Sequence, residues 1–111
     1  MTEDGNLAYV RTAEDASVVG FIQFKPTALT NWFFEERIGF IREFWIAEAY
    51  RKQGHGSRLL AMAEAYFAGQ GIRRVLLTTD TAESFYEKHG YRHDACYAAK
   101  NRDDVFVKTL L

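Results

Sequence analysis

Residues 48–57 read EAYRKQGHGS and join two segments with different periodicity. The preceding run, Ile38–Ala47, is rich in β-branched and aromatic residues and predicts a strand. In the following run, about Gly54–Ala68, apolar residues recur at helical spacing. We therefore expect a strand that passes through a short loop into an amphipathic helix.

The chemistry of this loop favours an anion. Gly54 and Gly56 let the backbone curl tightly and let a ligand approach, because neither residue carries a Cβ. The first N–H groups of a helix have no partner inside it and lie at the positive end of its dipole. With Arg51, Lys52 and Arg58 beside them, they predict a pyrophosphate site. The segment has neither the ending of a Walker loop nor the third glycine of the dinucleotide fingerprint.

Further elements follow from periodicity and turn residues. A short apolar run after the helix fits a buried strand, and a second helix is expected to begin at an Asp80 N-cap with Glu83 as its reciprocal partner and to stop at Gly90. The other predicted strands are Leu7–Thr12, Val18–Phe24, Val75–Leu77, Tyr91–Ala99 and Val105–Leu110.

The region around Pro26 is less regular. Pro26 is expected to end regular strand pairing or to place it at a sheet edge. Residues 27–37 leave two interpretations open, because Trp32-Phe33-Phe34 fits either a prolonged strand or an apolar loop.

The order of elements predicts a mixed α/β (α+β) fold. A strand–helix–strand crossover from Ile41 to Leu77 implies that these two strands are parallel, with a right-handed connection. The terminal hairpins are antiparallel. We expect a mainly antiparallel sheet with a central parallel pair and two helices, in one compact domain over residues 1–111.

Charge, apolar runs and cysteine content argue against several classes of protein. A formal net charge of −1 gives no basic field, so a nucleic-acid partner is not expected. Charged residues interrupt every apolar run, so no membrane span is expected. The single cysteine, Cys96, makes no internal disulfide, and no signal segment opens the chain, so we expect a cytoplasmic protein. Cys96 is predicted to be a small buried hydrophobic residue, because no basic partner is evident.

Two motifs resemble the GNAT superfamily of acetyl-CoA-dependent N-acetyltransferases. Arg51, Gly54 and Gly56 fill the positions of its R/Q-x-x-G-x-G/A signature. About thirty residues later, residues 82–91 (AESFYEKHGY) resemble its second hallmark, a short helix that carries Phe/Leu-Tyr and ends in Gly-Phe/Tyr. The resemblance is strongest from Ile41 to Tyr91. It implies a GNAT-like fold with acetyl-CoA as cosubstrate.

The resemblance also implies which residues bind the coenzyme. The backbone of the strand that includes Phe44-Trp45-Ile46 would pair with the pantetheine arm, as an added strand pairs with an open sheet edge. The loop and first helical turn would hold the pyrophosphate. The implied coenzyme-binding residues are Trp45, Ile46, Ala47, Arg51, Lys52, Gln53, Gly54, His55, Gly56, Ser57 and Arg58.

Two residues are predicted to be catalytic. Tyr86 occupies the position of the tyrosine that protonates the departing thiolate in the family, and a phenol keeps its proton at neutral pH. The alternative is a core tyrosine whose hydroxyl finds a backbone partner. Glu43 is the best carboxylate to accept the amine proton, directly or through water, and its alternative is a solvated strand residue.

The histidines are not expected to take part in the chemistry. His55 is expected to offer only its backbone N–H, and His89 is interpreted as a helix C-terminal residue. No metal site is predicted, because no histidine pair has ligand spacing to a cysteine or carboxylate.

The chain departs from the family pattern at its N-terminal side. Typical members carry an additional strand and two helices that build much of the acceptor pocket, and the residues before Val18 leave no room for them. A homodimer is expected to supply the missing wall. The predicted activity is transfer of acetyl from acetyl-CoA to a small-molecule or protein amine, and the alternative is a non-catalytic acyl-CoA-binding or partner-binding module.

Overall fold

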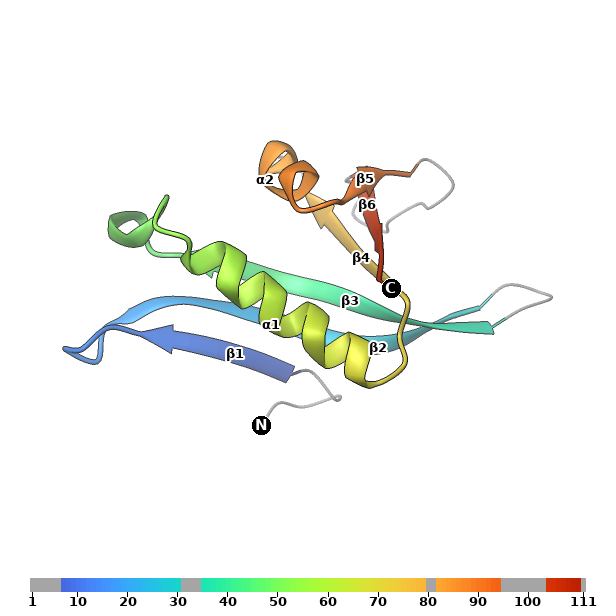
Figure 1. The fold of residues 1–111 in the computed structure, drawn as a ribbon, viewed down its shortest axis with the longest axis horizontal. Helices are drawn as coiled ribbons and strands as arrows, with labels where there is room; N and C mark the ends of the chain where they lie inside the picture. The colour runs from blue at the N-terminus through green and yellow to red at the C-terminus, as the bar shows by residue number, and fades with distance from the viewer. Residues whose placement is uncertain (1–6, 31–34, 80–81, 95–103, 111) are drawn as a thin grey trace.

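A computed structural model describes residues 7–30, 35–79, 82–94 and 104–110. Their strands form one six-stranded sheet in the order β1-β2-β3-β4-β6-β5 (Figure 1). In chain order the elements are β1 (Leu7–Thr12), β2 (Val18–Thr30), β3 (Glu35–Ile46), the 3-10 turn η2 (Glu48–Tyr50), α1 (His55–Gly69), β4 (Arg74–Thr79), α2 (Glu83–Lys88), β5 (Arg92–His93) and β6 (Asp104–Thr109).

The pairing confirms the predicted mixed sheet. β3 and β4 are parallel, with Gly39 opposite Val75 and Phe40 opposite Leu76. The other described pairs are antiparallel, including the hairpin of β1 and β2 and the terminal pair β5–β6. The helix α1 lies across one face of the sheet (Figure 1). The strand–helix–strand crossover is therefore present as the sequence indicates.

The strand β2 is longer than predicted. Of the two expectations for Pro26, an end to strand pairing is wrong, whereas a position at a sheet edge agrees with the described pairing. β2 continues past Pro26 to Thr30 and pairs with β3 throughout. In an antiparallel ladder, alternate residues point their backbone groups to opposite neighbours. The Ala47 N–H bonds to Val19 O, so the backbone groups of Val19 face β3. By the alternation along β2, those of Pro26 face the opposite neighbour, β1. Because Leu7 pairs with Phe24, Pro26 lies beyond the described β1, and its missing N–H removes no described bond.

The core lies between α1 and the sheet. Phe67 on α1 is fully buried over Gly39, where an added Cβ would lie 2.6 Å from the Phe67 ring. The ring of Phe24 meets that of Phe67 edge-on at 5.3 Å. Gly39 thus allows the helix to approach β3 closely. The other residues of this core are Ile22, Ile41, Leu59, Leu60, Ala63, Ile72, Val75, Leu77, Tyr86, Tyr91 and Phe106.

The start of α2 differs from the prediction. Ala82 occupies the N-cap position and Glu83 is the first helical residue, so Glu83 is not the third residue of a capping box. The Thr79 hydroxyl instead accepts the Ala82 N–H at 3.1 Å. Asp80 lies outside the described residues, as do Trp32-Phe33-Phe34 and Cys96. The helix ends before Gly90, whose φ of +92° suits a glycine C-terminal stop.

A polar cluster joins α1 to the C-terminal strands. Tyr91 donates its hydroxyl to Glu64 at 2.8 Å, and Lys108 donates to the same carboxylate at 3.0 Å. Burial, and then the neighbouring Glu64 carboxylate, raise the pKa of Tyr91 far above its ordinary value. Because each polar group has a partner, the cluster fixes α1 against β6 without an unpaired charge.

Within the described ranges, neither helix has the length and apolar content to cross a membrane.

Candidate functional site

The strands β3 and β4 separate where the site begins. They pair at only two positions, and β3 then runs on to Ile46 while β4 runs to Thr79 (Figure 1). A β-bulge marks the same point. Gln23 lies opposite Glu43 while Phe24 lies opposite Ile41, so Arg42 is the extra residue in β3. Such a bulge bends its strand and redirects side chains, which opens the sheet here.

Backbone groups of β3 face this gap in alternation. The Ala47 N–H donates to Val19 O at 2.8 Å, and the Ala47 carbonyl accepts the Tyr50 N–H at 2.8 Å. By the alternation of the ladder, Trp45 also turns its backbone toward β2, while Phe44 and Ile46 turn theirs toward the gap. Of the three backbone positions predicted from the resemblance, the geometry favours the N–H of Ile46, whose carbonyl accepts a bond from Arg51, and adds Phe44. Ala47 has both of its groups already bonded.

The loop after η2 turns twice through the left-handed region. Lys52 has φ +64° and Gly54 has φ +86°. A lysine rarely adopts this conformation, and such outliers concentrate at functional sites. The first helical bond of α1 runs from Arg58 N–H to Gly54 O at 3.1 Å. The N–H groups of residues 55–57 precede that bond and remain open to an anion.

A cavity of about 790 Å³, which we call the loop cavity, extends from this loop to α2. It contains seven of the eleven predicted coenzyme-binding residues. Its lining residues are Phe44, Trp45, Ile46, Tyr50, Arg51, Lys52, Gly54, Gly56, Ser57, Ala82, Phe85, Tyr86, Lys88 and His89. The structure thus brings residues of the two sequence motifs together in the lining of one cavity.

The remaining four predicted residues, Ala47, Gln53, His55 and Arg58, do not line this cavity. Gln53 donates its side-chain amide to Ala49 O at 3.2 Å, which stabilises the loop. Arg58 is exposed. Within the cavity, Arg51 donates its Nε–H to Ile46 O at 2.9 Å, which ties the loop to the end of β3.

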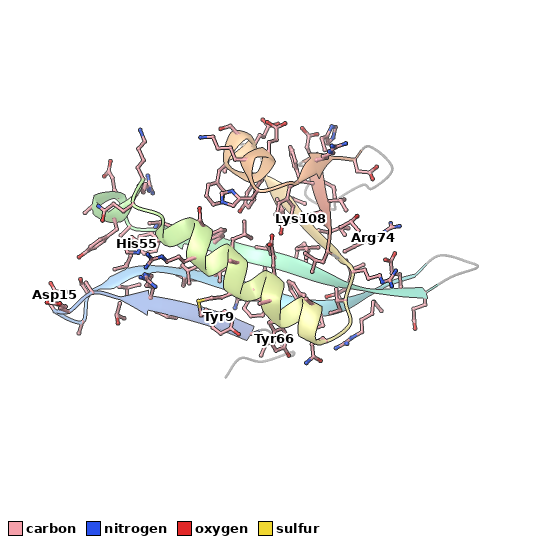
Figure 2. The ribbon with its side chains drawn as sticks, in the orientation of Figure 1. Tyr9, Asp15, His55, Tyr66, Arg74 and Lys108 are labelled. Atoms are coloured by element: carbon pink, nitrogen blue, oxygen red, sulfur yellow. The ribbon has the colours of Figure 1, made fainter. Side chains whose placement is uncertain are left out.

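The His55 side chain fixes the loop against the sheet. His55 lies at the start of α1 (Figure 2). Arg11 on β1 donates its Nε–H to His55 Nδ1 at 2.7 Å, and the ring of Tyr50 packs edge-on at 5.9 Å. Arginine can only donate, so Nδ1 is the acceptor and the proton lies on Nε2. His55 therefore has a side-chain role in addition to its backbone N–H.

His89 also has a side-chain role that the sequence did not indicate. Its Nδ1 lies 2.8 Å from Phe85 O and its Nε2 lies 2.8 Å from the Ser57 hydroxyl. A carbonyl only accepts, so Nδ1 carries the proton and Nε2 accepts the Ser57 O–H. This bond joins the first turn of α1 to the helix that carries Tyr86. Only the tertiary structure brings the two residues together, since they are 32 positions apart.

Tyr86 lines both the loop cavity and a second one of about 670 Å³, the bulge cavity. The Tyr86 side chain is 7% exposed, and burial raises the pKa of its hydroxyl to about 12. Its ring packs edge-on against Phe85 at 5.3 Å and Tyr91 at 5.7 Å. No described residue hydrogen-bonds to the Tyr86 hydroxyl. The core interpretation, in which that hydroxyl finds a backbone partner, therefore has no support among the described residues.

Glu43 also lines the bulge cavity. The lining residues are Phe21, Ile41, Arg42, Glu43, Phe44, Trp45, Leu77, Thr78, Thr79, Ala82 and Tyr86. The two residues predicted to be catalytic therefore share one cavity. In the part of the chain that the structure describes, no cluster of His, Cys, Asp and Glu could hold a metal ion.

Comparisons with known proteins point to one family. The model of the acetyltransferase (GNAT) family matches residues 1–91. The uncharacterized N-acetyltransferase YhfO of Bacillus subtilis (strain 168) is 31% identical over 85 residues, which cover 73% of this chain and 56% of YhfO. The chain thus spans about half the length of this curated relative.

Solved structures share the fold. An acetyltransferase of the GNAT family from Staphylococcus aureus Mu50 has a TM-score of 0.78 at 18% identity, with coverage of 96% of this chain and 69% of that one. The PaiA N-acetyltransferase from Thermoplasma acidophilum, solved with coenzyme A, has a TM-score of 0.75 at 22% identity, with coverage of 95% and 61%. Sequence match, fold and the two motifs agree, and the chain belongs to the acetyltransferase (GNAT) family.

Proposed function

We propose that the protein is an N-acetyltransferase that moves an acetyl group from acetyl-CoA to an amine by direct attack. Its family membership supports an acyltransferase. The loop cavity supports the coenzyme, because Arg51, Lys52 and the start of α1, with its unpaired N–H groups, line the same cavity as Tyr86. The pyrophosphate would bind at residues 51–57, and the pantetheine arm would lie along the backbone of Phe44 and Ile46.

The observation that carries the proposal is the Tyr86 hydroxyl. It belongs to a buried residue that lines both the loop cavity and the bulge cavity, and it hydrogen-bonds to no described residue. Burial keeps the proton on the phenol at neutral pH, since its pKa is raised to about 12. A buried unpaired donor costs stability, and such a group is retained at a site that uses it.

Glu43 would accept the amine proton. An ammonium has no lone pair, so the acceptor must lose a proton before it attacks the thioester. The Glu43 carboxylate is exposed, and it lines the same cavity as Tyr86. In the proposed reaction a C–N bond forms as the C–S bond breaks. The ammonium first gives one proton to Glu43, directly or through water, and the free amine then attacks. Tyr86 protonates the departing thiolate, and the second proton that the nitrogen loses returns through water to the Tyr86 oxygen.

A thiol-release assay with acetyl-CoA over a panel of amines tests the proposal. We expect Tyr86→Phe to lower kcat by about 10²- to 10⁴-fold, the usual contribution of a general acid, with little change in the KM for acetyl-CoA. Tyr66→Phe is the matched control. Tyr66 lies on α1 away from both cavities, where its ring packs on Phe24 (Figure 2).

Two outcomes would contradict the proposal. Equal turnover by Tyr86→Phe and wild type would remove Tyr86 from the chemistry. Coenzyme binding without thiol release on any amine would favour a non-catalytic acyl-CoA-binding or partner-binding module instead.

We also propose that the protein acts in the cytoplasm, where acetyl-CoA is available, as a homodimer. The edge strand β1 carries Val10, which is 59% exposed, and Val18 on β2 is 46% exposed. A second copy would cover these residues. Sedimentation at micromolar concentration should give twice the chain mass, and Val10→Lys should shift it toward the monomer. A monomer mass for the wild type would refute the dimer.

A further inference from the structure

The bulge in β3 presents two opposite charges side by side. Ile41 and Phe44 on either side of it pack toward the helices, and the two residues between them, Arg42 and Glu43, are both exposed. In a regular strand, neighbouring residues face opposite sides of the sheet. The extra residue at Arg42 therefore gives both side chains access to the bulge cavity, which they line together.

The charges of Arg42 and Glu43 have no partner among the described residues. No described residue forms a hydrogen bond or an ion pair with the side chain of Arg42 or Glu43. A cavity with an unpaired guanidinium beside an unpaired carboxylate complements a ligand that carries both charges. A ligand with an amine alone would leave Arg42 without a partner.

Aromatic rings form another wall of the same cavity. Phe21 on β2 lies directly opposite Trp45 on β3, and their ring centroids are 6.1 Å apart. Trp45 is 44% exposed, which is high for the largest apolar side chain. An exposed indole that lines a cavity offers a flat apolar surface to a ligand ring.

We propose that the acceptor is a free α-amino acid with an aromatic side chain. Its ammonium group would face Glu43, its carboxylate would bind Arg42, and its ring would pack on Trp45 and Phe21. The inference rests on the proposed N-acetyltransferase function and assigns the substrate class of that site. The reaction forms an N-acetyl amino acid and free coenzyme A. Glu43 takes the first proton from the ammonium before attack. Tyr86 protonates the thiolate, and the second proton that the nitrogen loses as the amide forms returns through water to Tyr86.

Binding and turnover are measured separately. In calorimetric titrations of the full chain with coenzyme A present, phenylalanine should bind at least about ten-fold more tightly than phenethylamine, which lacks the carboxylate, or 3-phenylpropionate, which lacks the amine. Thiol release from acetyl-CoA with phenylalanine and phenethylamine should show the same preference in kcat/KM.

Variants separate the two recognition elements. Arg42→Gln should bring the ratio of phenylalanine to phenethylamine affinity down to about one, because only phenylalanine has the carboxylate. Arg73→Gln, the same change at an exposed arginine that lines neither cavity, should keep the wild-type ratio. Trp45→Ala should weaken phenylalanine about ten-fold, and Trp45→Phe should restore most of that affinity, since it keeps an aromatic ring.

The outcomes distinguish this inference from the proposed function. Efficient turnover of amines without a carboxylate, together with an unchanged affinity ratio in Arg42→Gln, would overturn the acceptor class while the acetyltransferase proposal stood. Tight, Arg42-dependent binding of phenylalanine without thiol release would support the site and refute the activity. Equal binding of all three ligands by the wild type would overturn the inference.

Discussion

Replacing Gly54 by alanine tests whether the left-handed turn of the loop is built for an anion. Gly54 has φ +86°, and no described atom lies within 4 Å of a Cβ added there. The methyl group therefore meets no clash, and the cost of the change is the left-handed conformation itself. That cost is about 1–2 kcal/mol for a residue with a Cβ.

Gly71 offers a matched control. It has φ +76° and the same free space around an added Cβ. Gly54 precedes α1 and Gly71 follows it. Because α1 has 15 residues and rises 1.5 Å per residue, the two glycines lie roughly 22 Å apart along the helix. Gly54→Ala and Gly71→Ala should thus lower the free energy of unfolding by similar amounts.

Their effects on coenzyme affinity should differ. In Gly54→Ala the methyl group enters space at the loop cavity, or the loop relaxes and turns the N–H groups of residues 55–57 away from the anion. Loss of one charge-assisted hydrogen bond costs about 1.5–3 kcal/mol, which corresponds to about 10- to 100-fold in Kd. Gly71→Ala changes none of these groups, so its Kd should equal that of the wild type.

Calorimetric titration with coenzyme A gives the affinities, and urea denaturation gives the stabilities. The reasoning fails if both variants bind coenzyme A equally well at matched loss of stability. It also fails if Gly71→Ala weakens binding as much as Gly54→Ala, because affinity would then follow global stability alone.

Three further predictions concern the core. Glu64→Gln should lower the free energy of unfolding by about 1–3 kcal/mol in urea, because it weakens the bonds from Tyr91 and Lys108, with coenzyme affinity unchanged; an unchanged midpoint would contradict this. Burial raises the pKa of Tyr86 from 10 to about 12, so unfolding makes the phenol easier to deprotonate. The free energy of unfolding should therefore fall by on the order of 2 kcal/mol as the pH rises from 10 to about 12. The fall should be smaller in Tyr86→Phe. An identical alkaline decline in both proteins would refute that assignment. Gly39→Ala should destabilise by about 1–3 kcal/mol through its contact with the Phe67 ring, measured by thermal unfolding, and a neutral effect would show that α1 shifts freely.

Local patterns determined much of the fold. β1 has the predicted bounds, Leu7–Thr12, and α1 begins within one residue of its predicted start at Gly54. These elements follow from periodicity and glycine stops, which act over a few residues. Two expectations failed: Pro26 does not end strand pairing, and α2 does not begin with the predicted capping box. In both places the outcome depended on which neighbouring group was present to take or offer a hydrogen bond.

The loop at residues 48–57 also combines features that the local sequence predicts with contacts that only the tertiary structure shows. Its glycines, cations and place before a helix were enough to predict an anion site, because backbone freedom and orphan N–H groups are local properties. The left-handed Lys52 was not predicted, nor were the side-chain bonds that fix the loop from His55 to Arg11 and from Ser57 to His89. Those partners are 44 and 32 residues apart.

By itself, then, the sequence determined the family, the order of elements and the two motifs. Only the tertiary structure decided where the sheet opens, because the bulge at Arg42 is a mismatch of register between two strands. It also decided that Tyr86, Glu43 and Arg42 line one cavity, that Tyr86 is buried and that its hydroxyl has no described partner. Strand register and side-chain burial depend on contacts between residues distant in the chain, so short sequence patterns cannot predict them.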